Sequence, residues 1–163
     1  MMDLMSEITP LEFNAVMHAD LMTFVHRCFV ELNSGQELSH APHLEVMAAR
    51  LQACLLGKGS RRMIISLPPR SLKSMTVSVA AVAWLLGRDP TKQIICASYG
   101  QDLADKHARG TRTVMTSSFY RRVFPQARLS PSKRSVEDFM TTAQGFRMAT
   151  SVGGVLTGRG GDV

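Results

Sequence analysis

The stretch 63–74, MIISLPPRSLKS, constrains the fold more than any other part of this 163-residue chain. It starts with a short apolar run rich in branched residues, which is typical of a strand buried in a sheet. Two prolines end the run, and Lys73-Ser74 opens an apolar segment that predicts a helix ending near Gly87. Because strand, turn and helix in direct succession form the building unit of α/β proteins, the stretch predicts an α/β fold.

The same stretch has most of the parts of a phosphate-binding loop. Such a loop needs a strand, a tight turn of converging N–H groups, and a helix that begins with a lysine and a hydroxyl residue. In G-x-x-x-x-G-K-[ST] the glycines would fall at Leu67 and Leu72, and a leucine before the lysine is strained if its φ is positive. Taken alone, the stretch fits a phosphate loop and a plain strand–turn–helix with a solvated Lys73 equally well.

The remaining pattern alternates helices with strands. A capping box at Thr9 starts the first helix, and a turn near Gln144-Gly145 separates the last two strands. This order predicts a mainly parallel sheet flanked by helices. The predicted elements are helices at 9–35, 42–56, 101–116 and 117–124, a strand at 92–98, and paired strands at 136–142 and 146–152.

Charge, apolar content and cysteine content limit the possible partners and the cellular compartment of the chain. A net charge of +6 and a pI of about 9.7 permit an acidic partner such as nucleic acid without requiring one. We expect no membrane-spanning segment, because no stretch is long and apolar enough. Cys28, Cys54 and Cys96 are widely spaced among apolar neighbours, which indicates reduced core residues in a cytosolic protein. His40 and His43 have no nearby partners that would complete a metal site.

Several short blocks follow the loop in a characteristic order. After Pro-Pro-Arg and Lys-Ser come LGRDP, a strand leading to SYGQDLA, an arginine-bearing helix, FYRRVFP and a closing GGVLTGRGGD. Together the blocks at 57–163 resemble the ATPase domain of phage terminase large subunits, the motors that package DNA into capsids. The resemblance implies a helical segment at 1–57 and a P-loop NTPase core of the additional-strand type at 58–163. The leucine before the lysine then looks like a variation within the family.

The resemblance also implies roles for the loop residues. Lys73 and Ser74 would hold the phosphates and the Mg²⁺ of bound ATP, and Arg70 would sense or polarise the γ-phosphate, which suits the fork geometry of its guanidinium. Ser71 and Leu72 would contribute mainly backbone N–H groups. The implied nucleotide-binding residues are Pro69, Arg70, Ser71, Leu72, Lys73 and Ser74.

Other positions have two interpretations each. Arg159 would act as an arginine finger on a neighbouring subunit's nucleotide in a homo-oligomeric ring, or lie solvated in a flexible end. Tyr99 and Gln101 follow a predicted strand end, where ligands bind in open α/β sheets, but helix capping explains them nearly as well. Scattered basic residues could contact DNA phosphates or form solvated helix faces. They are Arg109, Arg112, Arg121, Arg122, Arg128, Lys133 and Arg134.

The implied partners are double-stranded DNA, the terminase small subunit and the portal protein of the procapsid, in the cytoplasm of a bacterial host. In the family an apolar strand with paired acidic residues comes next, followed by a nuclease domain, and we expect 1–163 to be truncated before both. Asp162 has no apolar strand before it and does not fit as the missing acid. We therefore expect weak ATP binding at most, without useful hydrolysis or DNA cleavage.

The alternative is a non-hydrolysing interaction or regulatory protein that reuses the fold and binds DNA or an intact terminase. A third interpretation, a piece of another P-loop translocase such as a helicase, is disfavoured by the SYGQDLA and GGVLTGRGGD blocks.

Overall fold

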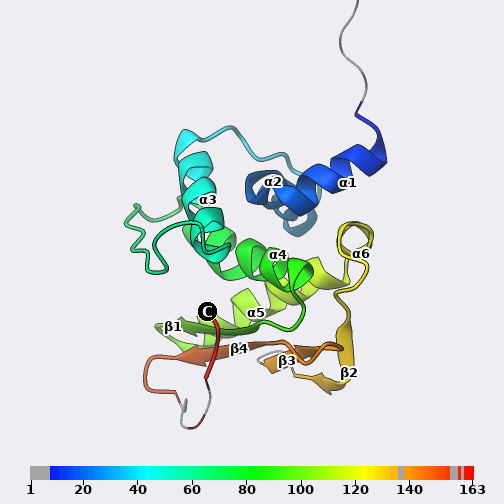
Figure 1. The fold of residues 1–163 in the computed structure, drawn as a ribbon. Helices are drawn as coiled ribbons and strands as arrows, with labels where there is room; N and C mark the ends of the chain where they lie inside the picture. The colour runs from blue at the N-terminus through cyan, green and yellow to red at the C-terminus, as the bar shows by residue number, and fades with distance from the viewer. Residues whose placement is uncertain (1–7, 136–137, 155–157, 159) are drawn as a thin grey trace, which may run out of the picture.

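Helices form the first half of the chain and cover a four-stranded sheet in the second half (Figure 1). The computed structural model describes residues 8–135, 138–154, 158 and 160–163. Its α/β character confirms the predicted class. The elements are α1 (Pro10–Ala19), α2 (Leu21–Leu32), α3 (Pro42–Leu55), the π-helical turn η1 (Met75–Ala80), α4 (Ala81–Arg88), β1 (Gln93–Ser98), α5 (Gln101–Thr116), α6 (Ser118–Val123), β2 (Leu129–Arg134), β3 (Asp138–Thr141) and β4 (Phe146–Ser151).

The sheet is mixed, so the prediction of a mainly parallel sheet is wrong. Its strand order is β1-β4-β3-β2, and only β1 and β4 run parallel. The predicted pairing of β3 with β4 is confirmed as antiparallel. Gln144, at φ +70°, and Gly145 join these two strands by a tight turn, which reverses the chain direction. A long stretch of chain connects β1 to β4, as the pairing of parallel strands requires.

The strand β2 was not predicted from the sequence. Its sequence, LSPSKR, is polar and contains Pro131, which cannot donate a backbone hydrogen bond. β2 lies at the edge of the sheet, where a proline is tolerated, and its register with β3 shifts along the pair. The edge position therefore explains both the composition and the missed prediction.

The segment 63–67 is not a buried strand, which corrects the sequence prediction. It lies outside the described sheet, as an extended loop beside α3 (Figure 1), and Ile64 is 97% exposed. The edge of β1 is paired instead with the end of the chain, where the Ile95 N–H donates to the Val163 carbonyl at 2.9 Å. Branched residues favour a strand only where a neighbouring strand and a packing surface are present. Among the described residues, the segment 63–67 has no neighbouring strand to pair with.

The N-terminal region is two helices, not one helix over 9–35. The predicted capping box at Thr9 is present, with the Glu12 carboxylate accepting from the Thr9 N–H at 2.8 Å. Asp20 interrupts the helix and caps α2, because its carboxylate accepts from the Thr23 N–H at 2.7 Å. An aspartate at this position competes with the helical backbone for hydrogen bonds and so starts a new helix.

Aromatic side chains join the N-terminal helices to the rest of the chain in one core. Phe24 of α2 packs edge-on against Phe124, with ring centroids 5.6 Å apart, and also contacts Tyr120. Trp84 of α4 is fully buried and donates from its indole nitrogen to the Met17 carbonyl of α1 at 3.2 Å. Burying each such ring contributes roughly 1.5–3 kcal/mol, so the helices at the start of the chain are held firmly against α4 and α6.

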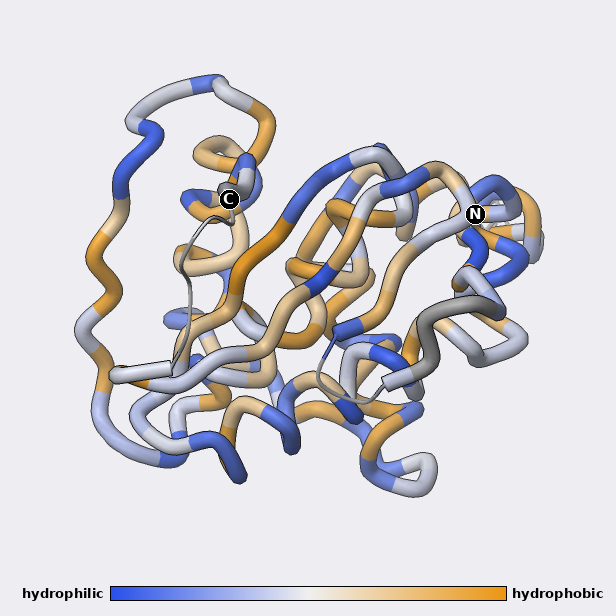
Figure 2. The backbone as a smooth tube through the Cα atoms, turned by 90° about the horizontal axis from the view of Figure 1, so that it is seen from below, coloured by the Kyte–Doolittle hydropathy of each residue, from blue (hydrophilic) through white to orange (hydrophobic). Residues whose placement is uncertain are grey.

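The helices in the middle of the chain, η1, α4 and α5, form the framework around the candidate site. The chain is helical without interruption over 73–88, first as η1 and then as α4, and this confirms the predicted helix. The predicted helices at 42–56, 101–116 and 117–124 are also confirmed, as α3, α5 and α6. α5 lies between α4 and the sheet (Figure 1), and the view from below shows both apolar and polar residues along the strands (Figure 2). No described helix combines the length and apolarity needed to cross a membrane.

Candidate functional site

The backbone of the loop before η1 has an unusual conformation. Arg70 has φ +63° and Leu72 has φ +56°, whereas Ser71 and Lys73 do not have positive φ. Successive residues that alternate between the right-handed and left-handed backbone regions turn their N–H groups toward the same side. This arrangement creates a concave anion-binding surface called a nest. Each non-glycine residue in the left-handed region costs about 1–2 kcal/mol. The loop therefore holds a strained conformation of the kind that phosphate-binding loops use.

Hydrogen bonds close the loop on itself. The Lys73 ammonium donates to the Leu67 carbonyl at 3.1 Å, and the Ser71 hydroxyl donates to the Pro68 carbonyl at 2.8 Å. On the α3 side, the imidazole Nε2 of His43 lies 3.4 Å from the Ser71 carbonyl. These contacts fix the turn directly before the helix, whose first backbone N–H groups have no partner within the helix.

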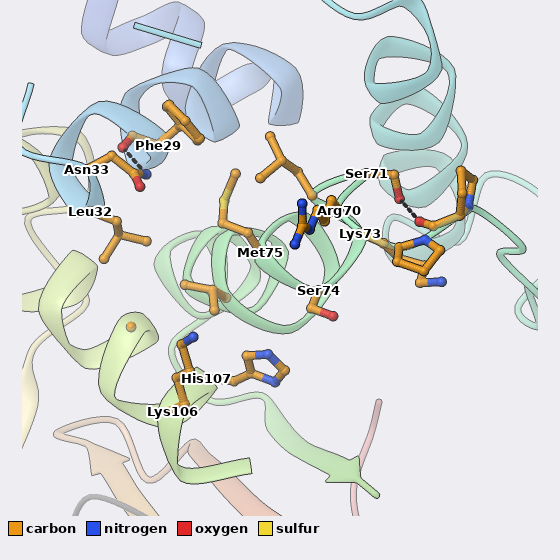
Figure 3. A pocket seen from close by; sticks show the side chains of 15 residues that line it. Phe29, Leu32, Asn33, Arg70, Ser71, Lys73, Ser74, Met75, Lys106 and His107 are labelled. Atoms are coloured by element: carbon orange, nitrogen blue, oxygen red, sulfur yellow. Dashed lines mark hydrogen bonds between the residues drawn. The ribbon is translucent and has the colours of Figure 1, made fainter. Parts of the chain in front are cut away.

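A pocket of about 670 Å³ opens beside this loop. The loop and first helical turn form one wall, the end of α2 forms a second, and α5 forms a third (Figure 3). The size and the mixture of apolar and polar walls are typical of small-molecule sites. Its lining residues are Phe29, Leu32, Asn33, Pro68, Pro69, Arg70, Ser71, Leu72, Lys73, Ser74, Met75, Val79, Lys106, His107 and Gly110.

All six predicted loop residues line this one pocket. Figure 3 shows Arg70 on the side of Met75, and the exposed Ser74 lies between the loop and α5. Arg159 falls outside the described residues. Tyr99 is 92% exposed, and Gln101 bonds Asp105 on its own helix at 2.7 Å, so neither belongs to the pocket.

The sequence did not indicate the contribution of α2 and α5. Asn33 caps the end of α2 and donates from its side-chain amide to the Phe29 carbonyl at 2.8 Å (Figure 3). Lys106 and His107 face the loop from α5, a helix on which most exposed residues are also polar. Gly110 places α5 against η1, and a Cβ there would be in van der Waals contact with the Val79 methyl groups at 3.4 Å. Only this packing selects which polar residues reach the pocket.

The lining is electropositive. Arg70, Lys73 and Lys106 bring three cationic side chains, and the described lining residues include no carboxylate. Burial, followed by the charges of Arg147 and Lys106, lowers the pKa of His107, so this imidazole is neutral at neutral pH. The three cationic side chains of the lining favour an anionic ligand.

Three of the scattered basic residues lie away from the pocket. Arg121 and Arg122 are exposed on α6, and Arg128 is exposed before β2. Within the described ranges, no group of three or more metal-ligating side chains occurs. Cys28 is buried and Cys54 and Cys96 are half-buried, and all three are free thiols.

The lowered pKa of His107 predicts a pH-dependent stability. The unfolded chain binds this proton at a higher pH than the folded chain, near a pKa of about 6.5. The free energy of unfolding therefore decreases as the pH falls below about 7. We expect the Tm to fall between about pH 7.5 and pH 5.5, and to fall less in His107→Gln. His40→Gln, exposed in the loop before α3, is the control, and an unchanged slope in His107→Gln would contradict the prediction.

No protein-family model matches the chain, and no curated protein matches it either.

Proposed function

We propose that this chain binds Mg-ATP through the loop 68–74, as the nucleotide-binding part of a DNA-packaging ATPase of the terminase large-subunit type. One observation carries the proposal: Arg70 and Leu72 both have positive φ, on either side of Ser71 and directly before the helical lysine. Two left-handed non-glycine residues in one short loop need a functional reason, and a nest for phosphate oxygens supplies it. The chemistry of the pocket wall agrees with such a ligand.

Each loop residue then has a role in binding. Lys73 exchanges its bond with the Leu67 carbonyl for the β- and γ-phosphates, and Arg70 binds γ-phosphate oxygens with its guanidinium. The exposed Ser74 hydroxyl fits the oxygen ligands that Mg²⁺ takes, and Ser74 would hold the ion. When bound, Mg²⁺ supplies positive charge that offsets the charge of the phosphates. The P-loop fold and double-stranded DNA as a partner belong to the same proposal.

A second candidate is a protein that binds nucleotide without hydrolysing it and acts through interactions with DNA or an intact terminase. The observation that favours it is the lack of a carboxylate among the described lining residues, because an attacking water is usually oriented or deprotonated by such a group. Phosphate release from Mg-ATP by the purified chain tests the second candidate. Steady turnover would exclude it, whereas binding without turnover is compatible with both candidates, because residues 1–163 are expected not to hydrolyse ATP at a useful rate.

Calorimetric titration of the folded chain with Mg-ATP tests the binding step, with adenosine as the control ligand. Adenosine lacks the phosphates and is expected to bind much more weakly. Absence of Mg-ATP binding to a demonstrably folded chain would contradict the nucleotide proposal.

Position 72 offers a test of the loop conformation itself. Leu72→Gly relieves the strain of φ +56°, whereas Leu72→Ala removes the same side chain and keeps the strain. We expect Leu72→Gly to bind Mg-ATP as tightly as the wild type or a few-fold more tightly, and Leu72→Ala to show no such gain. If Leu72→Gly loses binding that Leu72→Ala retains, the left-handed backbone does not serve the ligand.

A further inference from the structure

Arg147 is a charged side chain in the interior of the protein. It lies on β4 beneath α5, is 0% exposed, and ranks among the largest fully buried side chains. Its Nη2 reaches the Ser78 carbonyl at only 3.5 Å, and its Nε and Nη1 have no hydrogen-bond partner among the residues that the structure describes. Four buried side-chain atoms of the described residues lack a partner, and three of them belong to Arg147 and His107.

No carboxylate of the described residues neutralises this guanidinium at close range. The described ion pairs do not include Arg147, and Asp105 acts on it only as a more distant charge. Burial lowers the pKa of Arg147, but arginine keeps its proton in proteins. A buried cation without a counter-ion destabilises the folded chain, so its presence needs a reason other than stability.

Arg147 is connected to the candidate pocket through Ser78 and His107. Ser78, whose carbonyl it approaches, follows Ser74 by one helical turn, or about 5–6 Å. His107 lines the pocket, and Arg147 is close enough to lower its pKa. Thr111 of α5 also points its hydroxyl at the Ser78 carbonyl, at 3.3 Å, so η1, α5 and β4 meet at this carbonyl. Arg147 therefore contacts the helical segment that follows Ser74, and it lies within electrostatic range of the lining residue His107.

We propose that Arg147 supplies a buried positive charge that strengthens polyphosphate binding in the pocket without touching the ligand. This inference rests on the proposed function and extends it by one residue that the loop motif does not contain. In a medium of low effective dielectric, a unit charge within about 10 Å of an anion changes its affinity on the order of tenfold. The bound polyanion is the counter-charge that Arg147 lacks in the free chain.

The test compares Arg147→Met with the wild type in two measurements. Methionine has a similar volume and no charge, so thermal unfolding without ligand is expected at an equal or higher temperature. Titration with Mg-ATP is expected to show about tenfold weaker binding, and titration with AMP a smaller loss, because the effect scales with the charge of the ligand. A purely structural role would lower both the Tm and the affinity, and would not distinguish ATP from AMP.

The outcomes separate this inference from the proposed function. If the wild type binds Mg-ATP and Arg147→Met binds it equally well, the inference is wrong and the nucleotide site stands. If a folded wild type does not bind Mg-ATP, both are wrong. Should Arg147→Met fail to fold, Arg147→Gln is measured in the same way, and failure of both neutral variants to fold would show a structural role and overturn the inference.

Discussion

Replacing Lys73 with alanine is expected to abolish the binding of Mg-ATP. The Lys73 ammonium lies at the start of the helix and already bonds a loop carbonyl, Leu67 O, at 3.1 Å. A charge-assisted bond to phosphate is about twice as strong as a neutral one, and it acts here beside the helix N-terminus. We expect the dissociation constant to rise about 100-fold or more, which corresponds to about 2.7 kcal/mol. Calorimetric titration of both proteins with Mg-ATP measures the change.

Lys58→Ala is the matched control for this prediction. Lys58 is exposed in the loop after α3 and does not line the pocket. Its replacement removes one positive charge from the chain and is expected to leave the affinity unchanged. Equal affinities of the wild type and Lys73→Ala for Mg-ATP would refute the assignment of the site to this loop.

A substitution at Gly145 is expected to have the largest effect on stability. Gly145 is buried in the turn between β3 and β4, and its N–H donates to the Pro90 carbonyl at 3.1 Å. A Cβ at this position would collide with the Pro90 carbonyl oxygen and lie 2.7 Å from that of Lys92. Both are backbone atoms that cannot move as a flexible side chain can. We expect Gly145→Ala to lower the free energy of unfolding by about 3 kcal/mol or more.

Thermal unfolding measures this effect as a decrease in Tm of roughly 6–12 °C. Gly100→Ala is the control, because a Cβ at Gly100 meets nothing within 4 Å and its φ of −129° suits any residue. A small change in both variants would mean that the β3–β4 turn is not held against the loop before β1.

Local sequence patterns predicted most of the helices because helices depend on short-range interactions. The Thr9 capping box, the helix starting at Pro42 and the helix after Gly100 each have their signals within a few residues of the element. At Asp20, however, the local sequence is compatible with two structures. An aspartate can lie on the exposed face of a helix or cap a new helix, and here its bond to the Thr23 N–H selects the second.

Strands were predicted less well because a strand depends on distant partners. The pattern of 63–67 and that of β1 are similar, yet only β1 pairs with β4, through six registered residues from Gln93 to Ser98. The polar β2 forms because the edge of β3 is available to it. Hydrophobicity therefore identified segments able to form strands, and the topology decided which of them did.

Some features of the candidate site were also visible in the sequence, and others depend on the tertiary structure. The sequence by itself showed that Arg70, Lys73 and Ser74 have the order of a phosphate-binding loop and that Leu72 stands where such a loop usually has glycine. Both observations depend only on spacing along the chain. Only the tertiary structure decided that Leu72 adopts a positive φ, that Lys106 and His107 of α5 face the loop, and that Arg147 is buried. The reason is physical: packing between elements far apart in sequence sets backbone strain and burial, and no local pattern encodes it.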